Sequence, residues 1–424
     1  MRALGIDIGT TKMVVISYEV ETGEVSVCGH ATTPTLSPTL EGEHIQDAAA
    51  IIREVKRMVD AQLTDDVCAI GISGQMHGIV YLNEKGETVS PLYTWQDGRG
   101  KAHAESLGIS AGYGHATHAY NVENALVPST ALGYATIADA VALALCGASA
   151  PVLHASNAAS LGCFDIDKNR FVAPLKERYP YEIESGYRLL GDYRGIPVAI
   201  GIGDNQASVL GSGCRAGDLL INIGTGSQVS VLSDTPVSGD GIETRPAFDG
   251  QYLVVGAALC GGRAYAMLHR FFCDVVEMAT GERPESLYDA MGRYQIDATD
   301  ASLRFDNTFC GTRANPSRRG SISGIGTDNF TPEQFCIGLL EGMVGELAEL
   351  YSTIGLPVRA LVGAGNALRK DPLLQRLCEK RFGLPLRLPA HQEEAAVGAA
   401  LYALVCAGVF RDTNEATARI RGER

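Results

Sequence analysis

The chain has 424 residues, of which 46% are hydrophobic, 20% charged and 7% aromatic, a composition typical of a globular protein with two or three domains. Its formal net charge of -14 argues against nucleic acid and anionic membrane as partners, since both favour dense Lys and Arg. Eleven cysteines are scattered singly without a Cys-x-x-Cys pair, which predicts reduced thiols and no zinc site. Asp7 interrupts the first apolar stretch, and no later run is apolar enough to span a membrane, so we expect a cytoplasmic protein.

The first feature along the chain is LGIDIGTTKMVVIS, at 4–17, in which two apolar runs are joined by a glycine and two threonines. This pattern predicts two strands linked by a tight turn. Glycine allows the backbone to approach an anion closely, and Thr10 and Thr11 add hydroxyl donors, so the turn suits a phosphate. For one copy of the pattern, an ordinary hairpin is an equally good interpretation.

The next segments predict a mixed α/β layer. Residues 24–31 favour a third strand, and apolar residues at helical spacing predict a helix over 47–63 with Asp47 as its N-cap. The apolar run at 67–73 then predicts a short buried strand. Strands, a helix and a further strand in this order are what such a fold requires.

Polar residues bracketed by glycines follow that strand, in GQMHG at 74–78, and recur in YTWQDGRG at 93–100. Loops at strand ends are where open α/β sheets place groups that contact ligands. The donors and acceptors offered here are Gln75, His77, Gln96, Asp97 and Arg99. Trp95, the only tryptophan, could lie flat against the carbon face of a sugar, or it could pack in the core. His77 could contact the ligand or could be a structural histidine.

The middle of the chain leads to a second polar loop. No element is favoured over 108–136, and a helix that ends at Gly147 is predicted over 137–146. A loop and then a strand are predicted over 156–165, and one buried strand over 197–203. GDNQASVLGSG follows at 203–213, where Asp204 could cap a helix or accept a proton from an attacking hydroxyl.

The second half repeats the opening pattern. LLINIGTGSQVSVLS at 219–233 again predicts a hairpin with a phosphate turn, and its Gly224 lies 215 residues after Gly9. Two such turns predict two similar domains that face each other across one nucleotide. Further along, we expect a strand at 252–258 and a helix that begins with Gly261 and Gly262 and runs to about residue 272. We also expect a strand at 360–362 before the glycine-rich turn GAGN. An Ala-rich helix should begin near residue 393, and its Gly398 marks close helix packing.

These motifs, in this order, resemble the carbohydrate kinases of the FGGY family. DIGTT at 7–11 is similar to the first phosphate motif, GDNQAS at 203–208 to the segment of the catalytic base, NIGTGS at 222–227 to the second phosphate motif, and GAGN at 363–366 to the adenosine motif. The resemblance implies two ribonuclease H-like (actin-like ATPase) domains with mixed sheets flanked by helices, and an active site in the interdomain cleft. It implies an N-terminal domain, 1–213, with the sugar site and the base, and a C-terminal domain, 214–424, that binds ATP.

The resemblance also implies roles for individual residues. Asp204 would be the general base that deprotonates the sugar hydroxyl, and Asp7 and Asp204 would hold Mg²⁺. The remaining residues would bind the substrates: Gln75, Met76, His77, Trp95, Asp97 and Asn205 the sugar, Thr10, Thr11 and Lys12 the terminal phosphates, Gly224, Thr225 and Gly262 the rest of ATP, and Gly363, Gly365 and Asn366 the adenosine. ATP and a small sugar are thus the implied partners, and a homodimer is left open.

The style of the sugar motifs implies a ketose phosphorylated at a terminal hydroxyl. TWQDGR, SNAASLGCFD, GDNQASVLGS and LCGGRAYAML are most similar to the sedoheptulokinase branch of the family, with xylulokinases next. Two features depart from the family pattern. Lys12 follows Thr11 directly, two positions before the usual basic residue, and the Lys-Leu-x-Trp-Leu helix is missing near residues 120–136.

Two other interpretations stay open. The chain could be a filament-forming or chaperone-like ATPase, although the sugar motifs would have no purpose there. The shortened region also allows a sugar-binding regulator of the same fold whose catalysis is altered or lost. Relatives that use a Cys-rich zinc segment are disfavoured by the unpaired cysteines.

Overall fold

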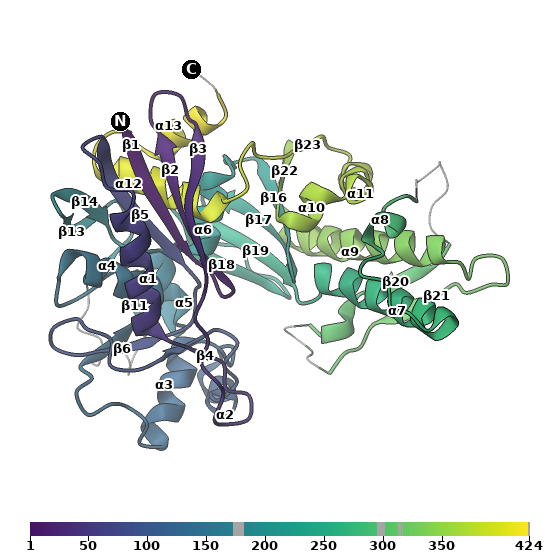
Figure 1. Cartoon of the computed structure of the whole chain (residues 1–424), viewed down its shortest axis with the longest axis horizontal. Helices are drawn as coiled ribbons and strands as arrows, with labels where there is room; N and C mark the ends of the chain where they lie inside the picture. Colours follow the sequence, from purple (N-terminus) through teal and green to yellow (C-terminus); the bar gives the residue numbers. More distant parts are fainter. Residues whose placement is uncertain (173–181, 295–301, 313–314, 316, 423–424) are drawn as a thin grey trace. The chain divides into compact units, whose positions relative to one another are not determined.

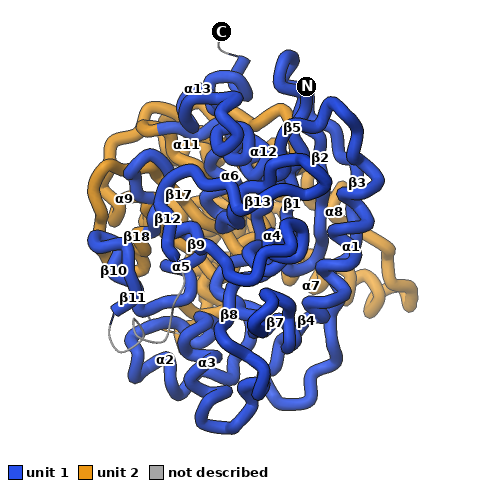
Figure 2. Tube along the Cα trace, turned by 90° about the vertical axis from the view of Figure 1, so that its left-hand side faces the viewer, with its two compact units in different colours: residues 1–215, 245–252, 393–424 blue, residues 216–244, 253–392 orange. Residues whose placement is uncertain are grey.

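The computed structural model describes residues 1–172, 182–294, 302–312, 315 and 317–422 (Figure 1). It divides into two compact units, coloured separately in Figure 2. The first comprises Met1–Arg215, Arg245–Tyr252 and Glu393–Arg424, and the second comprises Ala216–Thr244 and Leu253–Gln392. These units differ from the expected domains 1–213 and 214–424 in that the end of the chain returns to the first unit. No helix in the described ranges combines the length and apolarity needed to cross a membrane.

The first unit is built on a mixed sheet with the order β13-β14-β5-β1-β2-β3, in which β15 also pairs with β5. β1 is antiparallel to β2 and parallel to β5, and β15 is parallel to β5 as well. The strands are β1 (Arg2–Ile8), β2 (Lys12–Glu19), β3 (Val25–Thr32), β5 (Val67–Gly74), β13 (Leu189–Tyr193), β14 (Ile196–Ala199) and β15 (Ile202–Gly203). The carboxyl ends of β1, β5 and β15 therefore meet at one edge of the sheet.

Short paired strands and helices complete the first unit. The strand pairs are β4 (Ile45–Gln46) with β7 (Leu92–Tyr93), β6 (Val80–Leu82) with β8 (Gly133–Ala135), β9 (Val152–His154) with β12 (Glu182–Glu184), and β10 (Phe164–Asp165) with β11 (Arg170–Phe171). The helices are α1 (Ala48–Asp60), α2 (Lys101–Leu107), α3 (Gly114–Glu123), α4 (Ile137–Cys146), α5 (Ala155–Ser160), α6 (Asp204–Gly211), α12 (Glu394–Cys406) and α13 (Thr413–Ile420).

Each face of this sheet has its own apolar core, because the side chains of a strand alternate between faces. Ile6 and Val15 belong to the core shared with α1 and α4, whereas Val14 and Ile16 belong to the core shared with α6 and α12. On the second face, glycines in the strands let α12 come very close. A Cβ atom on Gly71 of β5 would lie 1.8 Å from the carbonyl oxygen of Ala399. The backbone of α12 therefore rests directly on the sheet.

The second unit has a sheet with the order β18-β19-β17-β16-β22-β23. Its strands are β16 (Asp218–Ile223), β17 (Ser227–Ser233), β18 (Ile242–Pro246), β19 (Tyr252–Ala258), β22 (Ala360–Ala364) and β23 (Leu386–Arg387), and β20 (Arg304–Asp306) pairs separately with β21 (Ser321–Ser323). β16 is antiparallel to β17 and parallel to β22, which repeats the pairing of β1 with β2 and β5. The duplicated sequence pattern thus gives a duplicated strand arrangement.

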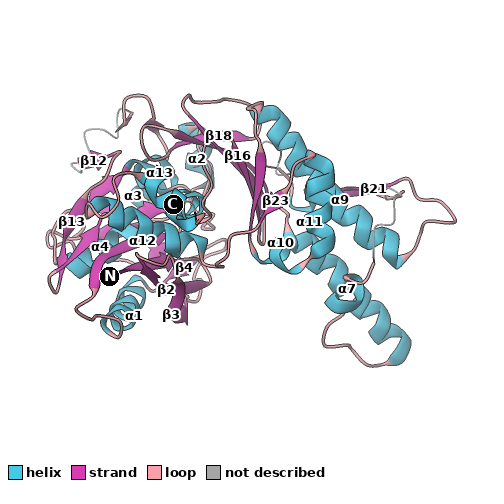
Figure 3. Ribbon diagram, turned by 90° about the horizontal axis from the view of Figure 1, so that it is seen from above, coloured by secondary structure: helices cyan, strands magenta, loops and turns pink. Residues whose placement is uncertain are grey.

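The helices of the second unit are α7 (Gly262–Thr280), α8 (Tyr288–Met291), α9 (Pro332–Ile354), α10 (Asn366–Lys370) and α11 (Pro372–Phe382), with a 3₁₀ turn, η2, at Thr308–Cys310. α9 lies beside both α7 and α11 (Figure 3). Cys336, Leu340 and Leu347 of α9 are buried in an apolar core shared with the sheet. α9 is therefore the central helix of this unit.

Several predicted elements are confirmed. Both predicted hairpins form, and β19 and α4 have the predicted bounds. Gly147 ends α4 with a positive φ of 64°, and Asp47 caps α1 by accepting a hydrogen bond from the Ala50 N–H at 2.8 Å.

Other predicted elements are wrong in detail. Asp204 is the first residue of α6 and not its N-cap, because Gly203 takes the extended capping position. A loop and then a strand are predicted over 156–165, but Ala155–Ser160 form the helix α5, which starts where the His154 ring accepts a hydrogen bond from the Ser156 N–H. The predicted strand at 197–203 is split into β14 and β15, and α7 extends eight residues beyond 272, to Thr280. The unassigned region contains α3 and β8.

The contact of α12 with α6 gives a first prediction. A Cβ on Gly398 would lie 1.8 Å from the Ala207 carbonyl oxygen, whereas one on Gly345, within α9, would meet nothing within 4 Å. Gly398→Ala should lower the free energy of unfolding by at least about 2 kcal/mol through overpacking, measured by chemical denaturation. Gly345→Ala is the matched control, since both changes add the same helix propensity, and it should be neutral or stabilising by up to about 1 kcal/mol. Equal effects of the two changes would contradict the packing argument.

Candidate active site

The carboxyl edge of the first sheet brings two acidic side chains together. Asp7 of β1 pairs in register with Ser73 of β5, which pairs in turn with Ile202 of β15, and Asp204 follows two residues later. The Ser73 hydroxyl donates a hydrogen bond of 2.8 Å to Asp7 Oδ1. Both carboxylates are partly buried. Residues separated by nearly 200 positions in the sequence therefore meet through parallel strand pairing.

Both carboxyl groups are electrostatically perturbed. Burial, and secondly the charge of Asp7, raise the pKa of Asp204 from 3.8 to about 7, although Arg245 and backbone N–H groups at the start of α6 act in the opposite direction. The pKa of Asp7 is raised to about 6, chiefly by burial and also by Glu393, against the Ser73 hydrogen bond and the charge of Lys12. Such a pair is stabilised by a cation.

The carboxylate oxygens of Asp7 and Asp204 suit Mg²⁺ better than a metal ion that is bound by protein side chains alone. In the described part of the chain, no group of three or more His, Cys, Asp or Glu side chains is arranged to hold a metal. Mg²⁺ usually keeps several waters and is bound through one or two carboxylates together with phosphate oxygens of a substrate. Asp7 and Asp204 can supply those carboxylates.

The turn of the first hairpin is linked to the polar loops. The Thr10 hydroxyl accepts a hydrogen bond of 2.9 Å from Trp95 Nε1 and lies 3.4 Å from Gln75 Oε1. Thr11 is exposed, whereas Lys12 forms an ion pair of 2.7 Å with Glu393, just before α12. The structure thus places all three turn residues at the same edge as Asp7, with Lys12 already paired.

The predicted sugar residues lie in two environments. Trp95 is 46% exposed, so packing in the core does not explain it. Gln75, Met76 and Asp97 are buried, and Asn205 Nδ2 lies 3.6 Å from Met76 Sδ. These contacts bring the GQMHG loop to the start of α6.

Two of the predicted sugar residues also have clear structural partners. His77, at a positive φ of 72°, donates from Nδ1 to the Ser160 carbonyl oxygen at 2.8 Å and stacks on Tyr113. Asp97 accepts a hydrogen bond of 2.7 Å from Arg99 Nε within a buried ion pair. Both residues therefore fix the shape of their loops.

The predicted nucleotide residues of the second unit also converge. The Gly262 N–H donates to the Gly224 carbonyl oxygen at 2.8 Å, and the Arg263 N–H donates to the Thr225 carbonyl oxygen at 3.1 Å. Gly365 has a φ of 88°, and a Cβ on it would lie 2.4 Å from the Ile223 carbonyl oxygen, so only glycine fits. The second hairpin, the start of α7 and the GAGN turn are thus packed together.

A cavity of about 610 Å³ adjoins these glycines and is within the usual size of small-molecule sites. Gly262 and Asn366 line it, as do residues that the sequence reasoning missed, chiefly Tyr265, Tyr288 and Lys370. Tyr265 lies one turn of α7 after Gly262, so helical spacing could have indicated it. The aromatic rings suit a flat heterocycle such as a nucleobase.

Comparison with known proteins shows the family of this chain. Residues 2–122 match the N-terminal domain of the FGGY family of carbohydrate kinases, and residues 219–407 match its C-terminal domain. The chain therefore belongs to the FGGY family of carbohydrate kinases. It is an ATP-dependent kinase whose acceptor is a sugar or related alcohol, with the two-domain actin-like ATPase fold.

Individual relatives cover nearly the whole chain. Sedoheptulokinase of Mus musculus is 27% identical, over 95% of this chain and 97% of its own, and glycerol kinase of Acidovorax ebreus is 26% identical, over 86% and 82%. The solved xylulose kinase of Lactobacillus acidophilus has a TM-score of 0.84 at 19% identity, with 99% of this chain and 92% of its own covered. At that identity, the structural likeness shows the fold.

The raised pKa of Asp204 predicts how stability depends on pH. The pKa of Asp204 is about 7 in the folded state, against the ordinary value of 3.8 expected for the unfolded chain. The contribution of this group to stability is therefore fully present below about pH 4 and is lost as the pH rises through about 7. Asn cannot ionise, so Asp204→Asn should raise the free energy of unfolding by about 1–3 kcal/mol near pH 8 without Mg²⁺, and by almost nothing near pH 4.

Thermal unfolding at the two pH values measures this difference. The exposed carboxylate of Asp192 provides the control, since Asp192→Asn should change stability little at either pH. An Asp204→Asn variant that is no more stable than the wild type near pH 8 would show that this carboxylate is not strained in the folded state.

Proposed function

We propose that this kinase transfers the γ-phosphoryl group of Mg-ATP to a terminal hydroxyl of sedoheptulose, with Asp204 as the general base. The observation that carries the catalytic part is the position of Asp204 beside Asp7 at the carboxyl edge of the first sheet. The similarity to sedoheptulokinases, which extends over 95% of the chain, supports the sugar. The hydroxyl loses its proton to Asp204 as its oxygen forms the new bond to phosphorus, and ADP leaves.

The pKa of Asp204 suits this role. A general base is most effective when its pKa lies near the working pH, and burial brings this carboxyl to about 7. Asp7, fixed by Ser73, would hold Mg²⁺ together with Asp204. The cation would neutralise charge on the transferred phosphoryl group.

The remaining predicted residues divide between the two substrates. Trp95, with its exposed face, is proposed to lie against the sugar, and its N–H remains on Thr10. The other residues proposed to surround the sugar are Gln75, Met76, His77, Asp97 and Asn205. For the nucleotide we propose Thr10, Thr11 and Lys12 at the terminal phosphates, Gly224, Thr225 and Gly262 next to them, and Gly363, Gly365 and Asn366 around the adenosine.

The role of Asp204 can be tested by kinetics. Asp204→Asn should reduce turnover by roughly 10²–10⁴-fold, as expected for the loss of a general base. Nucleotide affinity, measured by calorimetry with ADP, should change little, because the proposed adenosine residues all lie in the second unit. Wild-type turnover in this variant would rule out the assignment, and Asp192→Asn again provides a control for the loss of one negative charge.

The choice of sugar is tested separately by measuring ADP release with sedoheptulose, xylulose, ribulose, fructose and glycerol. We expect the highest kcat/KM with sedoheptulose. A higher value with xylulose would move the chain to the alternative ketose without affecting the proposed mechanism. Sugar binding without any ADP release would instead support the regulator interpretation.

A further inference from the structure

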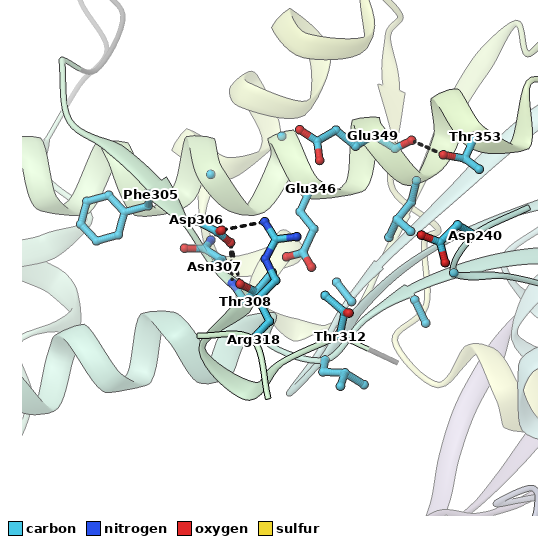
Figure 4. A pocket seen from close by; sticks show the side chains of 17 residues that line it. Asp240, Phe305, Asp306, Asn307, Thr308, Thr312, Arg318, Glu346, Glu349 and Thr353 are labelled. Atoms are coloured by element: carbon cyan, nitrogen blue, oxygen red, sulfur yellow. Dashed lines mark hydrogen bonds and ion pairs between the residues drawn. The ribbon is translucent and has the colours of Figure 1, made fainter. Parts of the chain in front are cut away.

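The second unit contains another cavity, of about 470 Å³, that shares no lining residue with the proposed nucleotide cavity (Figure 4). It lies between α9, the end of β19, the β20–η2 segment and the residues just before β18. Gly345 of α9 faces open space, since an added Cβ would meet nothing within 4 Å. The missing side chain at this position leaves room for a ligand of several heavy atoms.

The lining of this cavity is strongly acidic. Among the described residues, four carboxylates and one guanidinium line it, namely Asp240, Asp306, Glu346, Glu349 and Arg318. Arg318 is already used, since its Nη2 forms an ion pair of 2.8 Å with Asp306. Hydrogen bonds from Arg318 and Thr308 outweigh the effect of burial and hold the pKa of Asp306 below its ordinary value. The charge of Glu346 is therefore balanced poorly by the described residues around it.

Two acceptor atoms of residues that line the cavity have no hydrogen-bond donor among the described residues. Asn307 is 98% buried, and because its Nδ2 donates to the Leu339 carbonyl oxygen at 2.9 Å, its Oδ1 is left as an acceptor. Within the described residues neither this oxygen nor Glu346 Oε2 has a partner, and both atoms are buried. Figure 4 shows Glu346 extending from α9 beside the Arg318 guanidinium. Buried acceptors without donors are costly unless a ligand supplies the N–H or O–H groups.

We propose that this cavity is a binding site for a small organic cation whose ammonium groups donate hydrogen bonds to Glu346 and Asn307, such as an aliphatic diamine or polyamine. An ammonium group carries a positive charge, which complements the acidic lining, and up to three N–H donors, which can bond to the unpartnered oxygens. A bare metal ion suits the site less well, because no three acidic, His or Cys side chains of the described chain converge on one point.

Glu346 also makes the binding sensitive to pH. Burial, and then the charges of Asp306 and Glu349, raise the pKa of Glu346 to about 7, while Arg318 lowers it. The charged and titratable groups around it are Asp306 of β20, Glu349 of α9, Arg318 before β21, Asp240 before β18 and the thiol of Cys260 before α7. A bound cation favours the ionised form, so affinity should fall by up to about tenfold between pH 8 and pH 6, and binding should release protons.

Isothermal titration of the full chain with putrescine and spermidine at constant ionic strength tests the proposal, with 1,4-butanediol as the uncharged analogue of putrescine. Glu346→Gln should weaken amine binding by at least about tenfold, since it keeps the shape and removes the charge. Glu333→Gln removes the same charge from the exposed first turn of α9 and should have less than a twofold effect. Gly345→Leu fills the open space and should abolish binding.

Kinase activity and circular dichroism confirm that each variant is folded. The proposal is supported if the wild-type chain binds the amines and if both Glu346→Gln and Gly345→Leu lose this binding. The proposal is overturned by absence of heat up to millimolar amine, by equal affinity for 1,4-butanediol, or by unchanged affinity in Glu346→Gln. These outcomes do not depend on which sugar the kinase phosphorylates or on the role of Asp204.

Discussion

The parallel pairing of β1, β5 and β15 is the constraint on which the proposed chemistry depends. It forces two partly desolvated carboxylates, Asp7 and Asp204, to the same edge of a sheet. In isolation this arrangement is unfavourable, as the raised pKa of each group shows. The surrounding fold holds it in place, which is typical of sites where a cation and a charged substrate supply the missing compensation. The predicted gain in stability on neutralising Asp204 would be the counterpart of its proposed role as the general base.

Glycine determines how closely the layers around this edge approach. Gly71 in β5 and Gly398 in α12 remove side chains where helix backbones contact a strand or another helix. Because α12 packs directly on β1 and β5, the residue just before it, Glu393, reaches Lys12 at the start of β2. Lys12, next to the turn of the first hairpin, is therefore fixed by the residue that precedes the helix covering the sheet.

The sequence predicted most of the regular structure because hydrophobic periodicity and turn chemistry are local. The two hairpins, α4 with Gly147 and α1 with Asp47 needed only neighbours a few positions away. Some failures occurred where tertiary partners decide the conformation, whereas α9 was not predicted although Thr331, Pro332 and Gly355 mark its ends locally. The short helix α5 is rich in Ser and Asn, and its polar groups are satisfied by buried contacts such as Asn157 Nδ2 with Asp139 Oδ1 at 3.0 Å, which no local pattern reveals.

The same distinction applies to the site. Motifs were enough to propose Asp7, Asp204 and Gly224 as site residues, since their residue types are tied to phosphate chemistry, and their roles stay predictions. The buried ion pair between Asp97 and Arg99 could not be foreseen, because Arg99 also pairs with Glu43 from a distant segment. The acidic cavity was also missed, since its lining comes from five separate stretches of the chain.

The return of the chain to the first unit affects the order in which the protein can fold during synthesis. The apolar face that α12 covers is made mainly by residues 3–210, but α12 is synthesised only after the whole of the second unit. At usual elongation rates, the interval between residues 215 and 393 lasts roughly 10–35 s. During that time the nascent first unit lacks α12, so we expect the part of the apolar face that this helix covers to stay exposed until the helix is made.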